Sequence, residues 1–169
     1  MTISTELHDR VTAKVTECIR KLVSAKRATK IVISVTYRTD MKVVAGLAYS
    51  DEMRIELSEP LLLSNIEDFF NTLIPHEVAH IITDLKYPNA KQAHGVEWKN
   101  AMRMLGIADP KSKHLYDVTV CPDVVRYRYV CSCPNRTFRV TKQLHSMMQK
   151  HARFCNDCDG RAVYWPAGD

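Results

Sequence analysis

The chain has 169 residues, of which 46% are hydrophobic and 25% charged, with a formal net charge of +5. These proportions are ordinary for a globular protein and exclude a disordered or fibrous chain. The apolar runs are only a few residues long, which excludes a membrane-spanning helix, and the length suits one domain with a small appendage.

Basic residues gather in the last third of the chain. Residues 1–110 hold 14 Lys and Arg against 14 Asp and Glu, whereas residues 111–169 hold 10 against 5. A neutral body with a basic end indicates an anionic partner, nucleic acid first, with solvated surface charge as the alternative. The N-terminus lacks an apolar signal core, so we expect a cytoplasmic location, where cysteines serve as metal ligands or free thiols.

The first part of the chain predicts one helix and three strands. Apolar residues at helical spacing predict an amphipathic helix over residues 5–26, with Cys18 on its buried face. The β-branched segment 30–37 is typical of a strand. Gly46 indicates a bulge or a close approach by another backbone. Segment 43–57 predicts a hairpin, because apolar residues alternate on both sides of a turn at Ser50–Glu52, namely Leu47, Tyr49, Met53, Ile55 and Leu57.

Two further helices are predicted in the middle of the chain. Ser64 and Glu67 have the spacing of a capping box, which predicts a helix start near residue 65. Pro75 removes a backbone donor and should kink that helix just before His76. After a loop, "GVEWKNAMRMLG" predicts a short helix that Gly106 stops.

The sequence changes in character near residues 110–118. We expect an α+β body over residues 1–115 and a small cysteine-bearing module over residues 116–169. In the module, "DVVRYRYVCSC", "RTFRVT" and "RAVYW" are strand-like, and "KQLHSMMQKH" favours a short helix.

The stretch "IPHEVAHIITDLK" places two histidines and a glutamate in an apolar helical run. His76 and His80 lie four residues apart, so they project from one face of a helix and can share one Zn²⁺. Glu77 can then act as a general base that takes a proton from the attacking water and passes it to the departing amine. The alternative is a pair of core or surface histidines with ordinary hydrogen-bond partners.

A catalytic zinc needs a third protein ligand, and spacing leaves its identity open. His94, at the start of the next helix, is favoured over Glu97, and His114 is a further candidate. The metzincin motif is excluded, because Thr83 and Lys86 stand where it needs glycine and histidine.

Other residues near the motif could support a reaction. Asp84 could orient a ligand or be a plain exposed acid at the helix end. His114 and Tyr116 could donate to a developing oxyanion or have a structural role. We interpret Trp98 as core packing.

Four cysteines near the C-terminus have the spacing of two metal-binding knuckles: Cys131, Cys133, Cys155 and Cys158. They could hold a tetrahedral structural zinc, which would stabilise a module too small for a large core. His145 and His151 are alternative ligands, and Cys121 is interpreted as a free thiol.

Basic residues around these cysteines are interleaved with aromatic ones, Tyr127, Tyr129 and Phe138. Such a mixture suits a phosphate backbone with unstacked bases, as in single-stranded or junction DNA. Each aromatic alone could equally be packing. The candidate DNA contacts are Arg126, Arg128, Arg136, Arg139, Lys142, Lys150 and Arg153.

The segment "IPHEVAHIITDLKYPNAKQAHGVEWKNAMRMLGI", with "AGLAYSDEMRIELSEPLLL" before it and "CSC…CNDC" after it, resembles the SprT/Spartan metalloprotease family. The resemblance implies a minimal zincin-like body with a C-terminal zinc ribbon and a structural zinc on the four cysteines. It implies an endopeptidase that acts on DNA-bound or DNA-crosslinked proteins. Glu77 would be its general base, and the catalytic zinc would lie on His76, His80 and His94.

Two other functions stay open. One is a DNA-binding zinc module with weak or no peptidase activity, because an intact motif does not prove turnover. The other is a general peptidase indifferent to DNA. A peptide substrate should bind beside residues 43–49 as an added strand.

Overall fold

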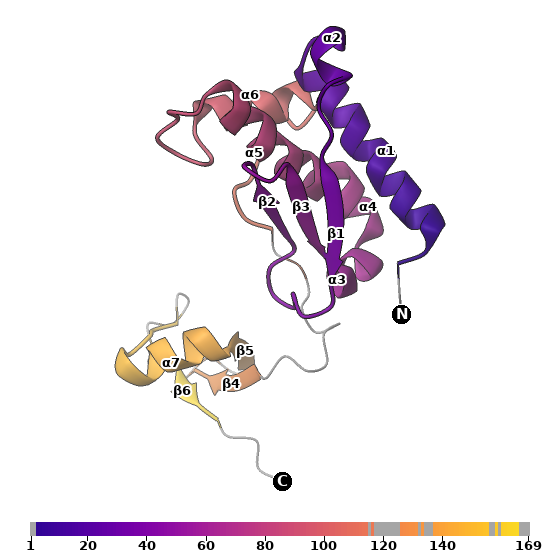
Figure 1. The fold of residues 1–169 in the computed structure, drawn as a ribbon. Helices are drawn as coiled ribbons and strands as arrows, with labels where there is room; N and C mark the ends of the chain where they lie inside the picture. Colours follow the sequence, from indigo (N-terminus) through magenta and orange to yellow (C-terminus); the bar gives the residue numbers. More distant parts are fainter. Residues whose placement is uncertain are drawn as a thin grey trace. The chain divides into compact units, whose positions relative to one another are not determined.

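The computed structural model describes residues 3–114, 116, 126–131, 133, 137–155, 158 and 160–165, apart from the side chains of Arg126 and Gln143. The chain divides into two compact units, Met1–Cys121 and Pro122–Asp169 (Figure 1). Each unit combines helix with a three-stranded sheet, which confirms the predicted α+β class. Within the described ranges, no helix is long and apolar enough to cross a membrane.

Helix α1 (Thr5–Leu22) opens the first unit and buries its apolar stripe, Cys18 included. Burial raises the pKa of the Cys18 thiol to about 11, as expected of a core residue. The helix ends earlier than the predicted residue 26, and a separate turn, α2 (Ala25–Ala28), follows. At the C-terminal end of α1, Lys86 Nζ donates to the Leu22 carbonyl oxygen at 2.5 Å, which satisfies one of the carbonyl groups that a helix end leaves without a partner.

The first sheet consists of β1 (Ser34–Arg38), β2 (Gly46–Tyr49) and β3 (Arg54–Ser58) in the order β1-β3-β2. β1 runs parallel to the central strand β3, and β2 runs antiparallel to it. The predicted hairpin is therefore confirmed as β2–β3, whereas the first strand starts later than predicted. β2 forms one edge of the sheet and packs against α5.

The two faces of β2 differ from what the apolar alternation suggests. Ala48 pairs with buried Ile55, so Gly46 and Ala48 share the inner face with the apolar residues of β3. Leu47 pairs with Glu56 on the outer face and is 40% exposed. Small residues occupy the inner face because α5 lies close against it.

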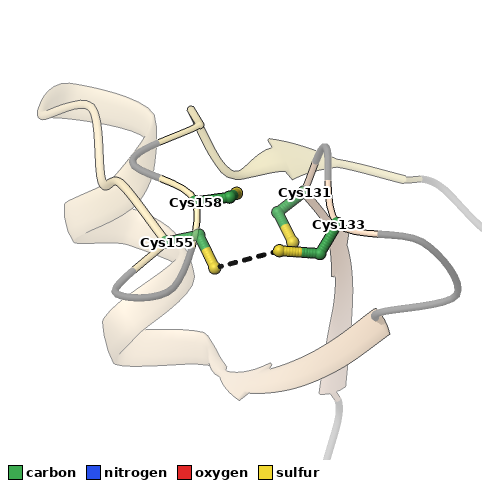
Figure 2. Close-up of side chains that lie close together, drawn as sticks. All are labelled: Cys131, Cys133, Cys155 and Cys158. Atoms are coloured by element: carbon green, nitrogen blue, oxygen red, sulfur yellow. Dashed lines mark hydrogen bonds between the residues drawn. The ribbon is translucent and has the colours of Figure 1, made fainter.

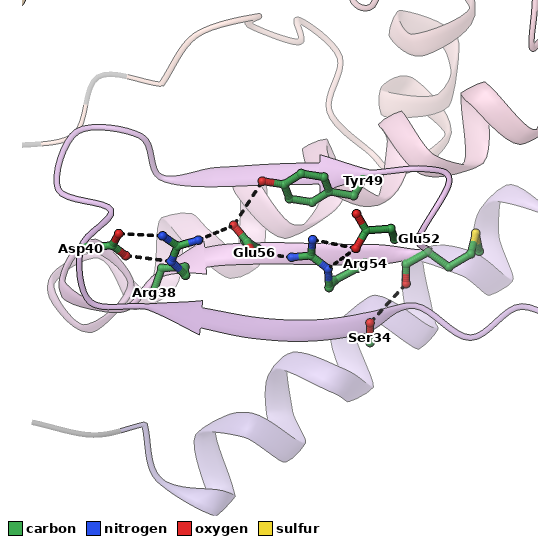
Figure 3. Close-up of polar contacts among 8 residues, drawn as sticks. Ser34, Arg38, Asp40, Tyr49, Glu52, Arg54 and Glu56 are labelled. Carbon is green, nitrogen blue, oxygen red and sulfur yellow. Dashed lines mark hydrogen bonds and ion pairs between the residues drawn. The ribbon is translucent and has the colours of Figure 1, made fainter.

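A charged network crosses the outer face of the first sheet (Figure 3). Glu56, only 8% exposed, lies between Arg38 and Arg54 and forms an ion pair with each. The Tyr49 hydroxyl donates to Glu56 Oε2 at 3.3 Å, which ties β2 to the central strand. Partly exposed ion pairs add little stability, but together these contacts favour one strand register.

The segment after β3 departs from the predicted capping box. α3 (Glu59–Ser64) is capped by Ser58, whose Oγ accepts from the Leu61 N–H at 3.3 Å. Ser64 ends this helix, and its hydroxyl donates back to the Pro60 carbonyl. The helix start predicted near residue 65 is confirmed, since α4 (Ile66–Asp68) begins there, but its N-cap is Asn65, so the capping box at Ser64 and Glu67 is wrong.

A π-helical turn, η1 (Phe69–Leu73), leads directly into α5 (Ile74–Lys86). The Ile74 N–H donates to the Phe69 carbonyl five residues back, and Pro75, which has no N–H, follows. The irregularity predicted at Pro75 thus takes the form of a widened turn just before it. Such a turn rotates the next residues of the helix relative to those before it.

Helix α6 (Val96–Met104) ends where the sequence predicts. Gly106 adopts a positive φ of 95°, and the Ile107 N–H donates to the Met102 carbonyl at 3.0 Å. This is a Schellman motif, in which glycine tolerates the left-handed conformation after the helix.

The second unit contains β4 (Arg126–Val130), β5 (Thr137–Thr141), helix α7 (Lys142–Lys150) and β6 (Val163–Tyr164). The strands are antiparallel in the order β5-β4-β6, and the predicted strands and helix are confirmed. The core of this unit is small: Tyr129, Val140 and Ala162 are buried, with Tyr127, Phe138, Leu144 and Met148 packed around them.

Candidate active site and second metal centre

Three imidazoles from two neighbouring segments converge in the first unit. His76 and His80 lie one turn apart on α5, and His94 comes from the loop just before α6. The three Nε2 atoms form a nearly equilateral triangle: 3.1 Å from His80 to His76, 3.1 Å from His80 to His94, and 3.2 Å from His94 to His76.

This spacing fits a single shared metal ion. Tetrahedral nitrogen ligands at 2.0–2.1 Å from Zn²⁺ lie about 3.3 Å from one another. The observed triangle is close to that value, so the three residues can serve as ligands without rearrangement. No ordinary hydrogen-bond pattern explains the triangle, because each neutral imidazole offers only one donor.

His76 is further held by two contacts that leave its Nε2 free for the metal. His114 Nε2 lies 3.0 Å from His76 Nδ1, so a neutral His114 can accept a hydrogen bond from the Nδ1–H of His76 and fix its tautomer. The Trp98 indole N–H donates to the His76 carbonyl at 3.4 Å, and its buried ring packs against all three imidazoles. Trp98 is thus core packing, as predicted, and it packs specifically around the site.

Burial keeps these histidines neutral. Desolvation first, then the charges of its histidine neighbours, lowers the pKa of His76 to about 2. Desolvation and His94 lower the pKa of His80 to about 4, and burial also lowers those of His94 and His114. Near neutral pH all four imidazoles therefore have a lone pair available for a ligand bond or a hydrogen bond.

Glu77 lies beside this triad and is only 5% exposed. Burial raises the pKa of its carboxyl to about 8. Its side chain packs directly against β2: a Cβ added to Gly46 would lie 2.7 Å from Glu77 Oε1 and 3.0 Å from Cδ and Cγ. The close approach at Gly46 is therefore made by the Glu77 side chain and not, as predicted, by another backbone, and no larger residue fits there unchanged.

A cleft of about 370 Å³ opens onto the triad and Glu77. One wall is the edge strand β2, and the other is formed by α5 and the segment that carries His94. Its lining residues are Gly46, Leu47, Ala48, His76, Glu77, His80, Asp84, Ala93 and His94.

The remaining polar candidates have other partners. Asp84 accepts a hydrogen bond from the Ser50 hydroxyl at 2.5 Å, which links α5 to the turn of the hairpin. The Tyr116 hydroxyl donates to Asp68 at 2.5 Å. Of the two roles considered for His114 and Tyr116, these contacts favour the structural one, because His114 Nε2 contacts His76 and the Tyr116 hydroxyl contacts Asp68. The contact of His114 with His76 could not be inferred from their separation in sequence.

The four predicted cysteines form a second cluster, in the C-terminal unit (Figure 2). Their sulfur atoms all lie within 4.8 Å of one another, and Cys133 Sγ is 3.8 Å from Cys155 Sγ. Thiolates at about 2.3 Å from a tetrahedral zinc lie about 3.8 Å apart. The cluster therefore has the composition and spacing of a closed, four-thiolate metal site. Its other two members are Cys131 and Cys158.

Neither alternative histidine belongs to this cluster. His145 stacks on Tyr127, with ring centroids 3.6 Å apart, and its Nδ1 lies 3.1 Å from the Tyr129 hydroxyl. His151 is exposed just after α7. The prediction for Cys121 lies outside the described residues.

The predicted basic residues divide between the two sides of the second sheet. Arg128 and Arg139 pair directly across β4 and β5 and are exposed on the face opposite the aromatic core. Lys142 and Lys150 lie on α7, and Arg153 follows it; all three are exposed. Arg136 and the side chain of Arg126 lie outside the described residues.

The aromatic residues expected to stack on bases are instead core. Tyr129 is 2% exposed, and Tyr127 and Phe138 pack against it. Among the described residues of this unit, the exposed aromatic rings are Phe154, Trp165 and Tyr164, which are 61%, 53% and 37% exposed. Sequence alternation along β4 could have separated the arginines from the tyrosines, whereas the exposure of Trp165 depended on the pairing of β6.

The first unit therefore has a candidate metal-dependent site on an α+β scaffold: a histidine triad from α5 and the loop before α6, beside a buried glutamate and an open strand edge. A family model described as the SprT-like family matches residues 12–120, which contain all of these residues. The chain belongs to the SprT-like family.

Several curated relatives carry the name Protein SprT. The chain is 37% identical over 121 residues to the protein of Pseudomonas savastanoi pv. phaseolicola, covering 71% of this chain and 73% of the relative. It is 37% identical over 115 residues to that of Pseudomonas syringae pv. tomato, covering 68% and 70%. It is 36% identical over 121 residues to that of Pseudomonas putida, covering 71% and 73%. No solved structure gave a significant match.

Proposed function

We propose that this protein is a zinc-dependent endopeptidase of SprT type with a zincin-like first unit. The observation that carries the proposal is the triangle of Nε2 atoms beside a buried carboxylate, at the floor of a cleft edged by a strand. His76, His80 and His94 would hold the catalytic zinc, which leaves one tetrahedral position open, as catalytic sites require.

Bound zinc would polarise the scissile carbonyl and acidify a water molecule. Glu77 supplies the proton transfers: its carboxylate takes the proton from the attacking water and later delivers it to the departing amine. Burial raises the pKa of this carboxyl in the metal-free chain, and the charge of a bound zinc would lower it again, which makes the carboxylate available as a base near neutral pH. His114 and Trp98 hold His76 in place, so that the base and the metal ligands keep a fixed geometry.

The substrate would bind as an extra strand on β2. Its unpaired edge, as far as the described residues extend, lines the cleft together with the triad. An extended peptide that hydrogen-bonds to this edge would lie with one carbonyl beside Glu77. Because the interaction uses the substrate backbone, it favours extended or unfolded protein segments over folded ones.

The second unit would be a zinc ribbon with a structural ion. Only three apolar residues of its core are buried within the described residues, which is little for an independently stable unit. A four-thiolate zinc would supply the missing folding free energy.

The ribbon would recruit DNA through the open face of its sheet. In the strand order β5-β4-β6, Arg139 of β5 lies opposite Arg128 of β4. On the other side of Arg128, the backbone N–H of Trp165 donates to the Arg128 carbonyl at 2.8 Å. Two arginines and an exposed indole therefore form one row across the sheet. Like charges directly opposite each other destabilise a sheet, and a bound phosphate would offset that cost. A base could stack on Trp165, which favours single-stranded DNA.

A Glu77→Gln variant tests the enzyme. Wild type and variant are incubated with a protein crosslinked to single-stranded DNA, and cleavage is followed on gels. We expect cleavage to fall by about 10²-fold or more in the variant, because its amide cannot accept the proton. Equal cleavage would contradict the proposal and favour a DNA-binding module without useful peptidase activity.

The same assay separates a DNA-associated protease from a general one. Cleavage of an uncrosslinked, unfolded protein that does not change with added DNA would favour the general peptidase. Charge reversal of Arg128 and Arg139, on the open face, together with Arg126 should weaken DNA affinity and flatten its dependence on salt. Unchanged DNA binding would remove the ribbon from the proposal.

A further inference from the structure

A second, apolar pocket is lined by residues from the end of α1, the turn α2 and the last turn of α5. Its volume is about 230 Å³, and it shares no lining residue with the active-site cleft. Pockets for drug-sized ligands measure roughly 300–1,000 Å³, so this one suits a single large side chain. It is lined by Val23, Arg27, Lys30, Ile31, Ile82, Leu85 and Lys86.

The interior of the pocket is apolar and its rim exposes more apolar surface. Ile82 forms part of the wall and is 1% exposed, whereas Leu85 is 48% exposed at the opening. Val32 and Tyr87, each next in sequence to a lining residue, are 78% and 50% exposed. Single exposed apolar side chains are common, but a group of them beside a preformed pocket marks a contact surface.

The charge around this pocket has one sign. Residues 18–39 contain six Lys and Arg and no Asp or Glu. Three of the lining residues are cations: Arg27, Lys30 and Lys86. Lys86 is engaged with the Leu22 carbonyl, whereas Arg27 and Lys30 are exposed and form no ion pair within the described part of the chain. The other residues of the range 1–110 carry 8 Lys and Arg against 14 Asp and Glu, so the basic charge is concentrated at this corner, which is complementary to an acidic ligand.

We propose that this pocket docks an acidic peptide segment of a partner protein. One leucine- or phenylalanine-sized side chain of the segment fills the pocket, and flanking Asp or Glu residues contact Arg27 and Lys30. An apolar anchor surrounded by complementary charges is the usual composition of a small recognition site. A nucleic acid fits less well, because an inserted base needs hydrogen-bond partners that these aliphatic walls lack.

Docking here would be independent of cleavage. The docking pocket and the cleft use different residues of α5: Ile82, Leu85 and Lys86 in one case, and the metal-ligand face in the other. A bound partner would therefore leave the cleft open, and the interaction would bring the protein to a partner rather than present that partner as substrate.

Peptide display tests the proposal on the full zinc-loaded chain. Random 12-residue peptides on phage are selected on the Glu77→Gln variant, so that cleavage cannot remove them. Counter-selection uses the same chain with Arg27→Glu, Lys30→Glu and Leu85→Ser added. Enriched peptides are then synthesised with a fluorescent label, and their affinities are measured by fluorescence polarisation. All variants must show the same circular dichroism spectrum and melting temperature.

Matched control substitutions are available on α6, where Lys99 and Met104 are exposed. We expect enriched peptides to carry a large apolar residue flanked by acids, and to bind at least tenfold more weakly after the changes at the pocket. Lys99→Glu and Met104→Ser should change affinity less than twofold. The proposal is overturned if no acidic-apolar sequence is enriched, or if enriched peptides bind both chains equally. Loss of affinity for a labelled single-stranded oligonucleotide, without peptide enrichment, would identify a nucleic-acid surface instead.

Discussion

Replacing Gly46 with alanine should displace the carboxylate of Glu77 and leave the metal ligands in place. The added Cβ would lie 2.7 Å from Glu77 Oε1, whereas ordinary contact begins at 3.4 Å, so the oxygen must retreat by about 0.7 Å. Misplacing a catalytic group by about 1 Å costs about 10²-fold in rate. We therefore expect kcat/KM to fall by about 10- to 100-fold, mostly in kcat, with zinc content unchanged.

A double-mutant cycle separates this displacement from a general effect on β2. Glu77→Asp shortens the side chain by one methylene group and makes room for the new methyl group. Gly46→Ala should therefore cost less than about threefold in activity when added to Glu77→Asp, although Glu77→Asp is itself impaired. Equal losses in both backgrounds would refute the contact between Gly46 and Glu77 as the cause.

The same contact can be tested without activity. With Glu77 present, overpacking costs about 1–3 kcal/mol, partly offset by about 0.5–1 kcal/mol gained when alanine replaces glycine in a strand. We expect Gly46→Ala to lower the melting temperature by about 2–4 °C per kcal/mol of net loss. In a Glu77→Ala background, which leaves space, it should raise the melting temperature slightly. A decrease of the same size in both backgrounds would contradict the geometry.

Three further predictions concern the metals and the open face of the ribbon. The purified chain should bind two equivalents of zinc, one lost in His94→Ala and the other in Cys155→Ser; metal analysis that finds any other pattern would contradict the two sites. In metal-free protein, burial lowers the pKa values of His76 and His80 from 6.5 to about 2 and about 4, so the unfolded chain takes up protons that the folded chain excludes. Its melting temperature should fall as the pH is lowered from 6.5 towards 4, and a melting temperature that does not depend on pH would refute this. Arg139→Glu should stabilise the second unit by about 0.2–1 kcal/mol, by removing a like-charge pair, and weaken binding to single-stranded DNA; loss of both stability and binding would indicate simple misfolding.

Sequence signals predicted the bounds of a helix well where the conformational preference of a single residue determines them. Gly106 ends α6 because only its backbone readily adopts a positive φ, and that property belongs to the residue itself. A helix does start near residue 65, but Ser64 is already the last residue of α3, so Asn65 and not Ser64 is the N-cap of α4. The spacing did not predict the preceding helix α3, whose cap Ser58 is the last residue of β3, so the end of that strand decides where α3 begins, and α3 ends at Ser64.

Which face a side chain occupies could not be read from alternation in β2. Leu47 and Tyr49 alternate as a buried pair would, yet they lie on the outer face, where Tyr49 contacts Glu56. The inner face needs small residues because the Glu77 side chain lies against it. Alternation shows that successive side chains lie on opposite faces of the strand, but it does not show which face is buried. That depends on what packs against each face.

The sequence by itself determined the chemistry that this protein can host: two imidazoles and a carboxylate on one helix, and four thiols in two pairs, are set by spacing along the chain. Only the tertiary structure decided which residues distant in sequence complete these sites. It brought His94 within 3.2 Å of His76, set His114 behind that ligand and directed Trp165 to the open face of its sheet. These contacts join residues far apart in sequence, and their formation depends on packing between elements rather than on any local conformational preference.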